Sequence, residues 1–419
     1  MVFLLGFVLA VAAFMYRDRD SIQRTSILFY RRTKSGIDKI ESLAARFPRF
    51  WSIYGWAGVA VSILVVPLSL LMVKQSIEQA IATGGQTGGP SLIAPGISGE
   101  ASFQSGISFI PAEYYIIGIG VLMAVHELSH GVVAAAEDME INSVGWIVLG
   151  IIPGAFVEPK GEKMLPGDGS ENDGSEEDDD LEDDEEDGQS KTEDGSSGGL
   201  WHQGTLSSRL KVLAAGSWAN FLTAGLFTLT AVLLFSMVTT PVGVGYDASN
   251  GTAAERNGLD NGTIYEFNDQ RVKYSDRLIE LTSGIEPGEE VSLNTSEGGF
   301  SFEAGERNGS GHIGILMYRN SGFVPTLRDM VADRREIKPG YSSFEGGISW
   351  TLSLFQMVAL LNILIGLFNL LPAKPLDGGQ MVGAVLDHFS ERLGKAFNAW
   401  SLLVWAGILL SILYSIAPI

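Results

Sequence analysis

The residues with the clearest chemical meaning are two histidines and a glutamate in the segment His126-Glu127-Leu128-Ser129-His130. On a helix, residues four positions apart lie on one face, so His126 and His130 can bind the same metal ion. The H-E-x-x-H spacing predicts zinc, with Glu127 beside the metal as the base that takes a proton from an activated water. The chain has five histidines and no cysteine. Zinc ligands must therefore be His, Asp or Glu, and disulfides are excluded.

A catalytic zinc ion keeps three protein ligands and one open position, so a third ligand is required. Two carboxylates are candidates. Glu158 follows His130 by 28 residues, and Asp377 lies in the segment NLLPAKPLDGG at residues 369–379. Two prolines interrupt a helix in that segment, and two glycines permit close approach of the backbone. The residues alone leave both candidates open.

The H-E-x-x-H motif lies inside an apolar run, where polar residues are costly and usually functional. Six apolar segments approach or exceed the about 20 residues that cross a bilayer. They are residues 1–16, 51–73, 115–136, 210–238, 348–371 and 396–416. We therefore expect a polytopic α-helical membrane protein of about six spans, with the lipid bilayer as a partner. The first segment has no positive residues before its apolar run, which argues against a cleaved signal peptide.

Charge predicts the orientation of the spans. The loop at residues 17–49 carries nine Lys or Arg residues against four Asp or Glu, and such basic loops stay in the cytoplasm. With six spans, both termini lie outside the cytoplasm. The same counting places residues 158–205 inside and residues 240–325 outside. Four N-x-S/T sequences in the latter region, starting at Asn250, Asn261, Asn294 and Asn308, agree with an exterior position.

The two long inserts differ in character. Residues 158–205 are rich in Gly, Ser and acidic residues, and 171–187 alone contains 13 acidic residues, so we expect a disordered acidic insert. Residues 240–325 instead alternate short β-like runs with turns, and contain Ala253–Leu259 and Ser275–Ser283 as short helices. This order resembles a PDZ domain of the bacterial protease type, which accepts an extended peptide along a strand edge. A small β-rich domain without a binding role is the alternative. The formal net charge is −21 and no basic domain is present, which argues against nucleic acid as a partner.

Residues 143–157 are apolar but too short to span, and their glycines and proline exclude a helix. They predict either a hairpin that enters the membrane from one side or a surface loop with a buried face.

The pair of motifs, His126 to His130 in one span and NLLPxxPLDGG in a later one, resembles the site-2 protease family of intramembrane metalloproteases. The resemblance implies His126, His130 and Asp377 as zinc ligands, Glu127 as catalytic base, and residues 143–157 as a membrane-re-entrant hairpin. The segment Ala215 to Asn220 is similar to the family's AGPxxN helix, although Ser217 replaces the proline. Asn220 is then a candidate for stabilising the oxyanion, with Asn369 as a second candidate.

The predicted organisation follows. Residues 1–73 hold two spans and the basic loop, 74–114 an extracytoplasmic loop, 115–157 the catalytic helix and hairpin, and 158–205 the acidic insert. Residues 206–239 are a core span, 240–325 the PDZ-like domain, 326–347 a linker, 348–394 a core span with the Asp motif, and 395–419 the last span.

The predicted function is an intramembrane zinc metalloendopeptidase with one Zn²⁺ per chain. Its substrates are membrane proteins with a transmembrane helix, cut by regulated intramembrane proteolysis, and a peptide is the predicted ligand of the PDZ-like domain. Two rivals remain: a catalytically silent zinc-binding membrane scaffold, and a peptide-sensing PDZ-type binding protein. The intact Glu127 argues against the scaffold, because a metal carrier needs no general base.

Overall fold

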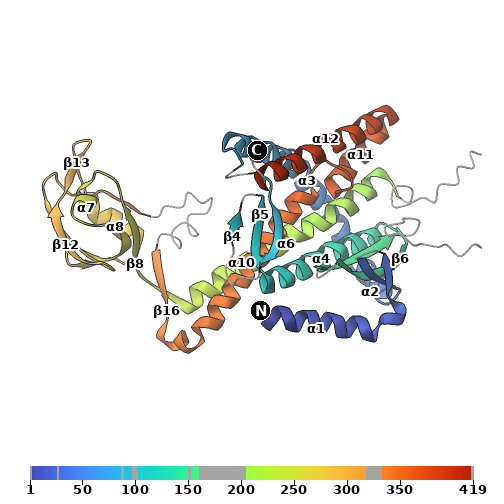
Figure 1. The fold of residues 1–419 in the computed structure, drawn as a ribbon, viewed down its shortest axis with the longest axis horizontal. Helices are drawn as coiled ribbons and strands as arrows, with labels where there is room; N and C mark the ends of the chain where they lie inside the picture. The colour runs from blue at the N-terminus through green and yellow to red at the C-terminus, as the bar shows by residue number, and fades with distance from the viewer. Residues whose placement is uncertain are drawn as a thin grey trace, which may run out of the picture. The chain divides into compact units, whose positions relative to one another are not determined.

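The structure, a computed structural model, describes residues 2–25, 28–85, 89–96, 102–104, 106–149, 152–159, 204–317 and 333–416. The chain forms two compact units (Figure 1). We call Met1–Thr230 with Ser353–Ile419 the membrane unit, and Ala231–Leu352 the insert domain.

Five helices in the described part of the chain are long and apolar enough to cross a membrane. They are α3 (Pro48–Ala82), α4 (Ala112–Ala136), α6 (Leu206–Val238), α10 (Glu345–Asn369) and α12 (Glu391–Ile416). The first predicted span forms a shorter helix, α1 (Val2–Arg17). At about 1.5 Å per residue, its 16 residues reach only about 24 Å. The structure therefore supplies five full-length candidates and a short sixth.

Small residues let these helices approach each other closely. A Cβ atom at Gly118 of α4 would lie 2.5 Å from Leu361 Cδ1 of α10, and one at Gly366 would lie 2.8 Å from the Phe221 ring of α6. Long apolar side chains such as Leu64, Leu226 and Leu402 remain exposed on the outer faces. Large exposed apolar surfaces of this kind are typical of a lipid-facing protein.

Residues 143–149 lie in β6 (Ile141–Leu149) and residues 152–157 in β7 (Ile152–Pro159), and the two strands pair as an antiparallel hairpin. The hairpin belongs to an antiparallel four-stranded sheet with the order β1-β2-β6-β7, in which β1 (Gln23–Thr25) and β2 (Leu28–Thr33) come from the basic loop. Gly145 makes this pairing possible, because a Cβ atom there would lie 2.2 Å from the Arg31 carbonyl oxygen. The basic loop is thus part of the hairpin's sheet. It continues into α2 (Ile37–Arg46), which packs on α4 through Ile40.

The segment between α3 and α4 is more structured than the predicted loop at 74–114. Helix α3 continues nine residues beyond the predicted end at Val73, because the polar residues after it are good helix formers. A small sheet of β3 (Leu92–Gly96), β4 (Ser102–Gln104) and β5 (Ile107–Pro111) follows, in the order β3-β5-β4. Its strands are too short to give a clear alternating pattern in the sequence.

The predicted core span at 348–394 is two helices separated by a break. Helix α10 ends at Asn369, and α11 (Asp377–Phe389) begins at Asp377. Glycine is required just after the break, because Cβ atoms at Gly378 and Gly379 would lie 2.3 Å and 2.2 Å from backbone atoms of Leu370 and Ala373. The chain therefore turns back tightly on itself and presents Asp377 at a helix start.

The insert domain is built around one sheet with the order β12-β11-β9-β8-β15. Its core strands are β8 (Thr239–Ala248), β9 (Asn261–Phe267), β11 (Glu290–Thr295), β12 (Gly298–Glu303) and β15 (Ile315–Met317), and its helices are α7 (Ala253–Arg256) and α8 (Ser275–Thr282). The short strand β10 (Gln270–Arg271) pairs with β9, and β13 (Gly305–Arg307) pairs with β14 (Ser310–His312). Val244, Ile264 and Val291 have no exposed surface in the core.

Two predicted boundaries change. The predicted linker at 326–347 contains strand β16 (Asp333–Ile337), which pairs with β8, and the short helix η2 (Pro339–Phe344). The predicted acidic insert at 158–205 starts too early, because Glu158 and Pro159 belong to β7. Residues 160–203, which carry the predicted disorder, lie outside the described residues.

Candidate metal centre

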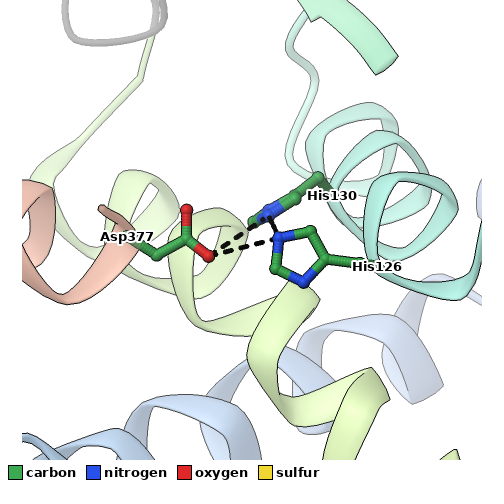
Figure 2. A group of neighbouring side chains, drawn as sticks. All are labelled: His126, His130 and Asp377. Atoms are coloured by element: carbon green, nitrogen blue, oxygen red, sulfur yellow. Dashed lines mark hydrogen bonds and ion pairs between the residues drawn. The ribbon is translucent and has the colours of Figure 1, made fainter. Parts of the chain in front are cut away.

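Helix α4 brings His126 and His130 together, one turn apart on a single face. Their Nε2 atoms lie 3.0 Å from each other, and the two rings meet edge to face (Figure 2). His126 is 5% exposed. Two imidazole nitrogens turned toward one point in a buried site are typical of a metal centre, since metal ligands occur at this spacing on helices.

Asp377 completes the group from the opposite side (Figure 2). Its Oδ2 atom lies 3.4 Å from His126 Nε2 and 3.5 Å from His130 Nε2. Metal–ligand distances of about 2.0–2.1 Å in a tetrahedral zinc site correspond to ligand–ligand edges of about 3.3 Å. The three edges of 3.0, 3.4 and 3.5 Å match this size. Asp377 Oδ2 is also buried and has no hydrogen-bond partner among the described residues, so the group fits a divalent cation.

The backbone of α6 orients one ligand. His130 Nδ1 lies 2.7 Å from the Val212 carbonyl oxygen, and donating a proton to it leaves Nε2 free to bind metal. The next residue back in the chain, Lys211, forms a buried ion pair with Glu137 at the end of α4. This ion pair joins α6 to α4 beside the carbonyl that fixes the His130 ring.

Two asparagines contact His126 on different ring nitrogens. Asn220 Nδ2 lies 3.1 Å from His126 Nδ1, on the side away from the metal position. Asn369 Nδ2 lies 3.4 Å from His126 Nε2, on the metal side. The amide of Asn220 is fully buried, and within the described part of the chain its Oδ1 atom has no hydrogen-bond partner. The two asparagines therefore cannot serve the site in the same way.

Glycine at position 216 allows α6 to pass beside the histidines. A Cβ atom there would lie 2.3 Å from His130 Nε2 and 2.7 Å from His126 Nε2. Any larger residue would occupy the space where a metal ion meets these nitrogens.

Glu127 is half-buried on α4 between the two histidines in sequence. Its carboxylate interacts with the Val157 backbone of β7. The catalytic-base candidate therefore lies beside the outer strand of the hairpin sheet.

The other candidate ligand, Glu158, is engaged elsewhere. Its carboxylate accepts hydrogen bonds from Ser143 Oγ at 2.6 Å and Arg32 Nη2 at 3.2 Å, and it is fully buried. The three-residue group that the described chain forms contains Asp377 and not Glu158. Arg32 comes from β2, so this carboxylate joins the basic loop to the hairpin.

One supporting contact had no signal in the sequence. Tyr54 of α3 lies 2.9 Å from Ser129 Oγ, and Ser129 Oγ donates to the Ala215 carbonyl oxygen at 2.9 Å. Ser129 is the fourth residue of the H-E-x-x-H segment, so α3 contacts the metal-binding turn directly. No spacing rule connects Tyr54 to a motif 75 residues later.

The fold and this buried His-His-Asp group define a multi-pass membrane protein with a candidate divalent-metal centre. The family model of peptidase family M50 matches residues 114–412. The chain belongs to this family of membrane zinc metalloproteases, and the predicted site-2 protease membership is confirmed. An uncharacterized protein of Methanocaldococcus jannaschii is 26% identical over 432 aligned residues, covering 96% of this chain and 94% of that protein. That similarity includes the N-terminal residues that precede the family match.

Replacing Gly216 tests whether α6 must pass this close to the histidines. We expect Gly216→Ala to lower the zinc content of the purified protein, because its methyl group collides with both ligands. Gly225→Ala is the matched control on the same helix, where a Cβ atom meets nothing within 4 Å. Metal analysis of both variants decides the point, and full zinc occupancy in Gly216→Ala would contradict the site geometry.

Two carboxylate-to-amide changes test the ligand set. Asp377→Asn should lose zinc, because a neutral amide is a poor zinc ligand. Glu158→Gln should keep zinc but melt at lower temperature, because the buried ion pair between Glu158 and Arg32 is lost. Zinc content and thermal unfolding in detergent separate the two effects. Loss of zinc from folded Glu158→Gln alone would reverse the assignment.

Proposed function

We propose that this protein is an intramembrane zinc metalloendopeptidase that cuts transmembrane segments of membrane proteins. The observation that carries the proposal is the buried triangle of His126, His130 and Asp377, whose edges have the size of a tetrahedral zinc site. Family membership supports a peptidase. A silent scaffold would need the ligands but not Glu127.

The three ligands would hold one zinc ion, which supplies a Lewis acid and lowers the pKa of a bound water. Glu127 acts as the general base and then as the acid. It takes a proton from the water that attacks the scissile carbonyl, and then passes this proton to the leaving amine. The contact between Glu127 and the Val157 backbone holds the carboxylate beside the strand where we expect the substrate.

The contacts of the two asparagines favour different roles. Asn369, on the Nε2 side of His126, can donate to the developing oxyanion. Asn220 contacts the Nδ1 side and positions the ring. If Nε2 of His126 binds the metal, its Nδ1 carries the proton. Turning the Asn220 amide so that Oδ1 faces this N–H gives that oxygen a hydrogen-bond partner.

The substrate would bind as an extended segment along β7, the outer strand of the sheet. Because the Val157 backbone contacts Glu127, its groups face away from β6. Antiparallel alternation directs the backbone groups of Ala155 and Pro153 the same way. Pro153 has no N–H group and Val157 already contacts Glu127. Ala155 therefore offers the central pair of backbone groups for a short substrate strand.

The insert domain would act as a PDZ-like peptide-binding domain that regulates access of substrates. The order of strands and helices around α7, β9 and α8 supports this. A peptide sensor without proteolysis is the alternative, and deleting the domain separates the two. A protease would still cut, with looser control.

The predicted topology gains support from contacts within the membrane unit. Strand β2 lies in the basic loop predicted to be cytoplasmic, and it pairs with β6, which follows the predicted cytoplasmic end of α4. Gly106, in a segment predicted outside, lies against the C-terminal end of α12, where a Cβ atom would be 3.2 Å from the Ile412 carbonyl oxygen. His126 follows Ala112, the first residue of α4, by 14 positions, or about 21 Å of helix. This distance supports a metal position within a hydrocarbon core about 30 Å thick.

Removing the proposed base should separate chemistry from metal binding. We expect Glu127→Gln to reduce cleavage at least about 100-fold, because proton transfer is lost. Zinc content should stay at the wild-type level, because no ligand changes. The measurement is cleavage of a single-span substrate by purified protein in detergent, with chelator-treated enzyme as the inactive reference. Full activity of Glu127→Gln would remove the proposed mechanism.

The roles proposed for the two asparagines predict different defects. Asn369→Ala should lower kcat by a factor on the order of 10²–10³ at full zinc occupancy, as loss of an oxyanion donor does. Asn220→Ala should instead weaken zinc binding by about 10–100-fold, as loss of a ligand-orienting partner does. Competition with a zinc chelator measures the second effect without any substrate. Equal zinc affinity in wild type and Asn220→Ala would refute the positioning role.

Single cysteines test the orientation, since the natural chain has none. Ser283 in the insert domain and Ser35 in the basic loop are both exposed. In intact cells, a membrane-impermeant thiol reagent should label Ser283→Cys and leave Ser35→Cys unlabelled until the membrane is opened. Reversed labelling would invert the whole topology. Labelling of both in intact cells would show that a predicted span does not cross.

A further inference from the structure

The N-x-S/T sequences of this chain are concentrated in one domain. The chain has 13 asparagines, and four of them begin such a sequence: Asn250, Asn261, Asn294 and Asn308. All four lie within residues 250–310, and none of the other nine asparagines is followed by a hydroxyl residue at the second position. The spans and the basic loop therefore carry no such sequence.

All four acceptor asparagines are exposed. Asn308 is the most accessible, because it forms the two-residue turn between β13 and β14, and residues 306–310 are all exposed. Its φ of 55°, followed by 81° at Gly309, is the geometry of a tight hairpin turn that directs the side chain outward. Asn294 is the least available, because its Nδ2 atom donates to Glu266 Oε2 at 3.0 Å.

Turn chemistry accounts for only part of this pattern. Asn-Gly pairs are favoured in hairpin turns, which explains the first two residues at Asn308. At Asn257-Gly258-Leu259 the same pair is followed by a buried Leu, which is 2% exposed. The Thr252 hydroxyl donates to the Ser249 carbonyl oxygen, and the Ser296 hydroxyl accepts from the Thr263 N–H. Both hydroxyls therefore have a local structural role. Ser310 is instead an exposed residue at the start of β14, and the turn does not require its hydroxyl.

We propose that the insert domain is a glycosylated surface, with Asn308 as its principal N-linked acceptor and Asn294 as the least used. The donor would be a saccharide activated on a lipid phosphate. The Asn308 amide nitrogen forms a bond to the anomeric carbon, the bond from that carbon to the phosphate oxygen breaks, and the amide nitrogen gives up one proton. The lipid phosphate leaves with the electron pair.

The inference rests on the proposed exterior position of the insert domain, and it is independent of proteolysis. Saccharides would add polar bulk to the exposed turn between β13 and β14. They would also fix the domain on one side of the membrane, because a glycosylated domain cannot cross back.

Glycopeptide mass spectrometry on the full-length protein, purified from membranes of the cells that encode it, tests the proposal. The peptide with Asn308 should carry a saccharide, and the peptide with Asn257 should not. Ser310→Ala should abolish the modification, whereas Ser310→Thr should retain it, because only the second keeps the acceptor sequence. Both substitutions are on an exposed strand end and leave the core intact.

Recovery of the Asn308 peptide from the wild-type protein only in its unmodified form would overturn the proposal. So would a saccharide that persists in Ser310→Ala, because the acceptor sequence would then not direct it. Thiol labelling of Ser283→Cys distinguishes the causes of a negative result. A labelled but unmodified domain refutes glycosylation alone, and an unlabelled one refutes the exterior position as well.

Discussion

Convergence of three polar side chains, the proposed metal ligands, on one buried point is the constraint on which the membrane unit depends. His126 and His130 come from α4, and Asp377 comes from a helix start about 250 residues later. Buried polar groups are costly unless they are paired or bind a metal. This convergence requires glycine at two places. Gly216 lets α6 pass beside the two histidines, and Gly378 and Gly379 let the chain before α11 turn closely against the backbone of residues 370–373.

Local patterns predicted the histidine pair and the apolar helices, because both depend on spacing within a single element. The third ligand was different. The residues left Glu158 and Asp377 open, and only the family resemblance favoured Asp377, because sequence spacing does not report which distant segments meet. The hairpin sheet could not be predicted for the same reason. Strand β2 pairs with β6 across more than 100 residues, and the basic loop showed only its charge. The small sheet at residues 92–111 gave too short a pattern.

The N-terminal segment has a structural role that its position outside the family match would not suggest. Strand β2 occupies one edge of the hairpin, which leaves β7 as the outer edge in the described sheet. Tyr54 supports Ser129 in the metal-binding turn. Loss of this segment would therefore remove a contact to the His126–His130 turn and a strand of the sheet that we propose binds the substrate.

The two buried carboxylates illustrate how partners, rather than residue type, decide function. Glu158 receives a guanidinium and a hydroxyl, so its oxygens are satisfied and its charge is balanced within the protein. Asp377 faces two imidazole nitrogens at distances too long for good hydrogen bonds. In the described chain, its Oδ2 atom has no hydrogen-bond partner. A buried charge left in that state is unfavourable unless a cation completes it. The same reasoning that assigns Glu158 to the sheet therefore supports Asp377 as the proposed metal ligand.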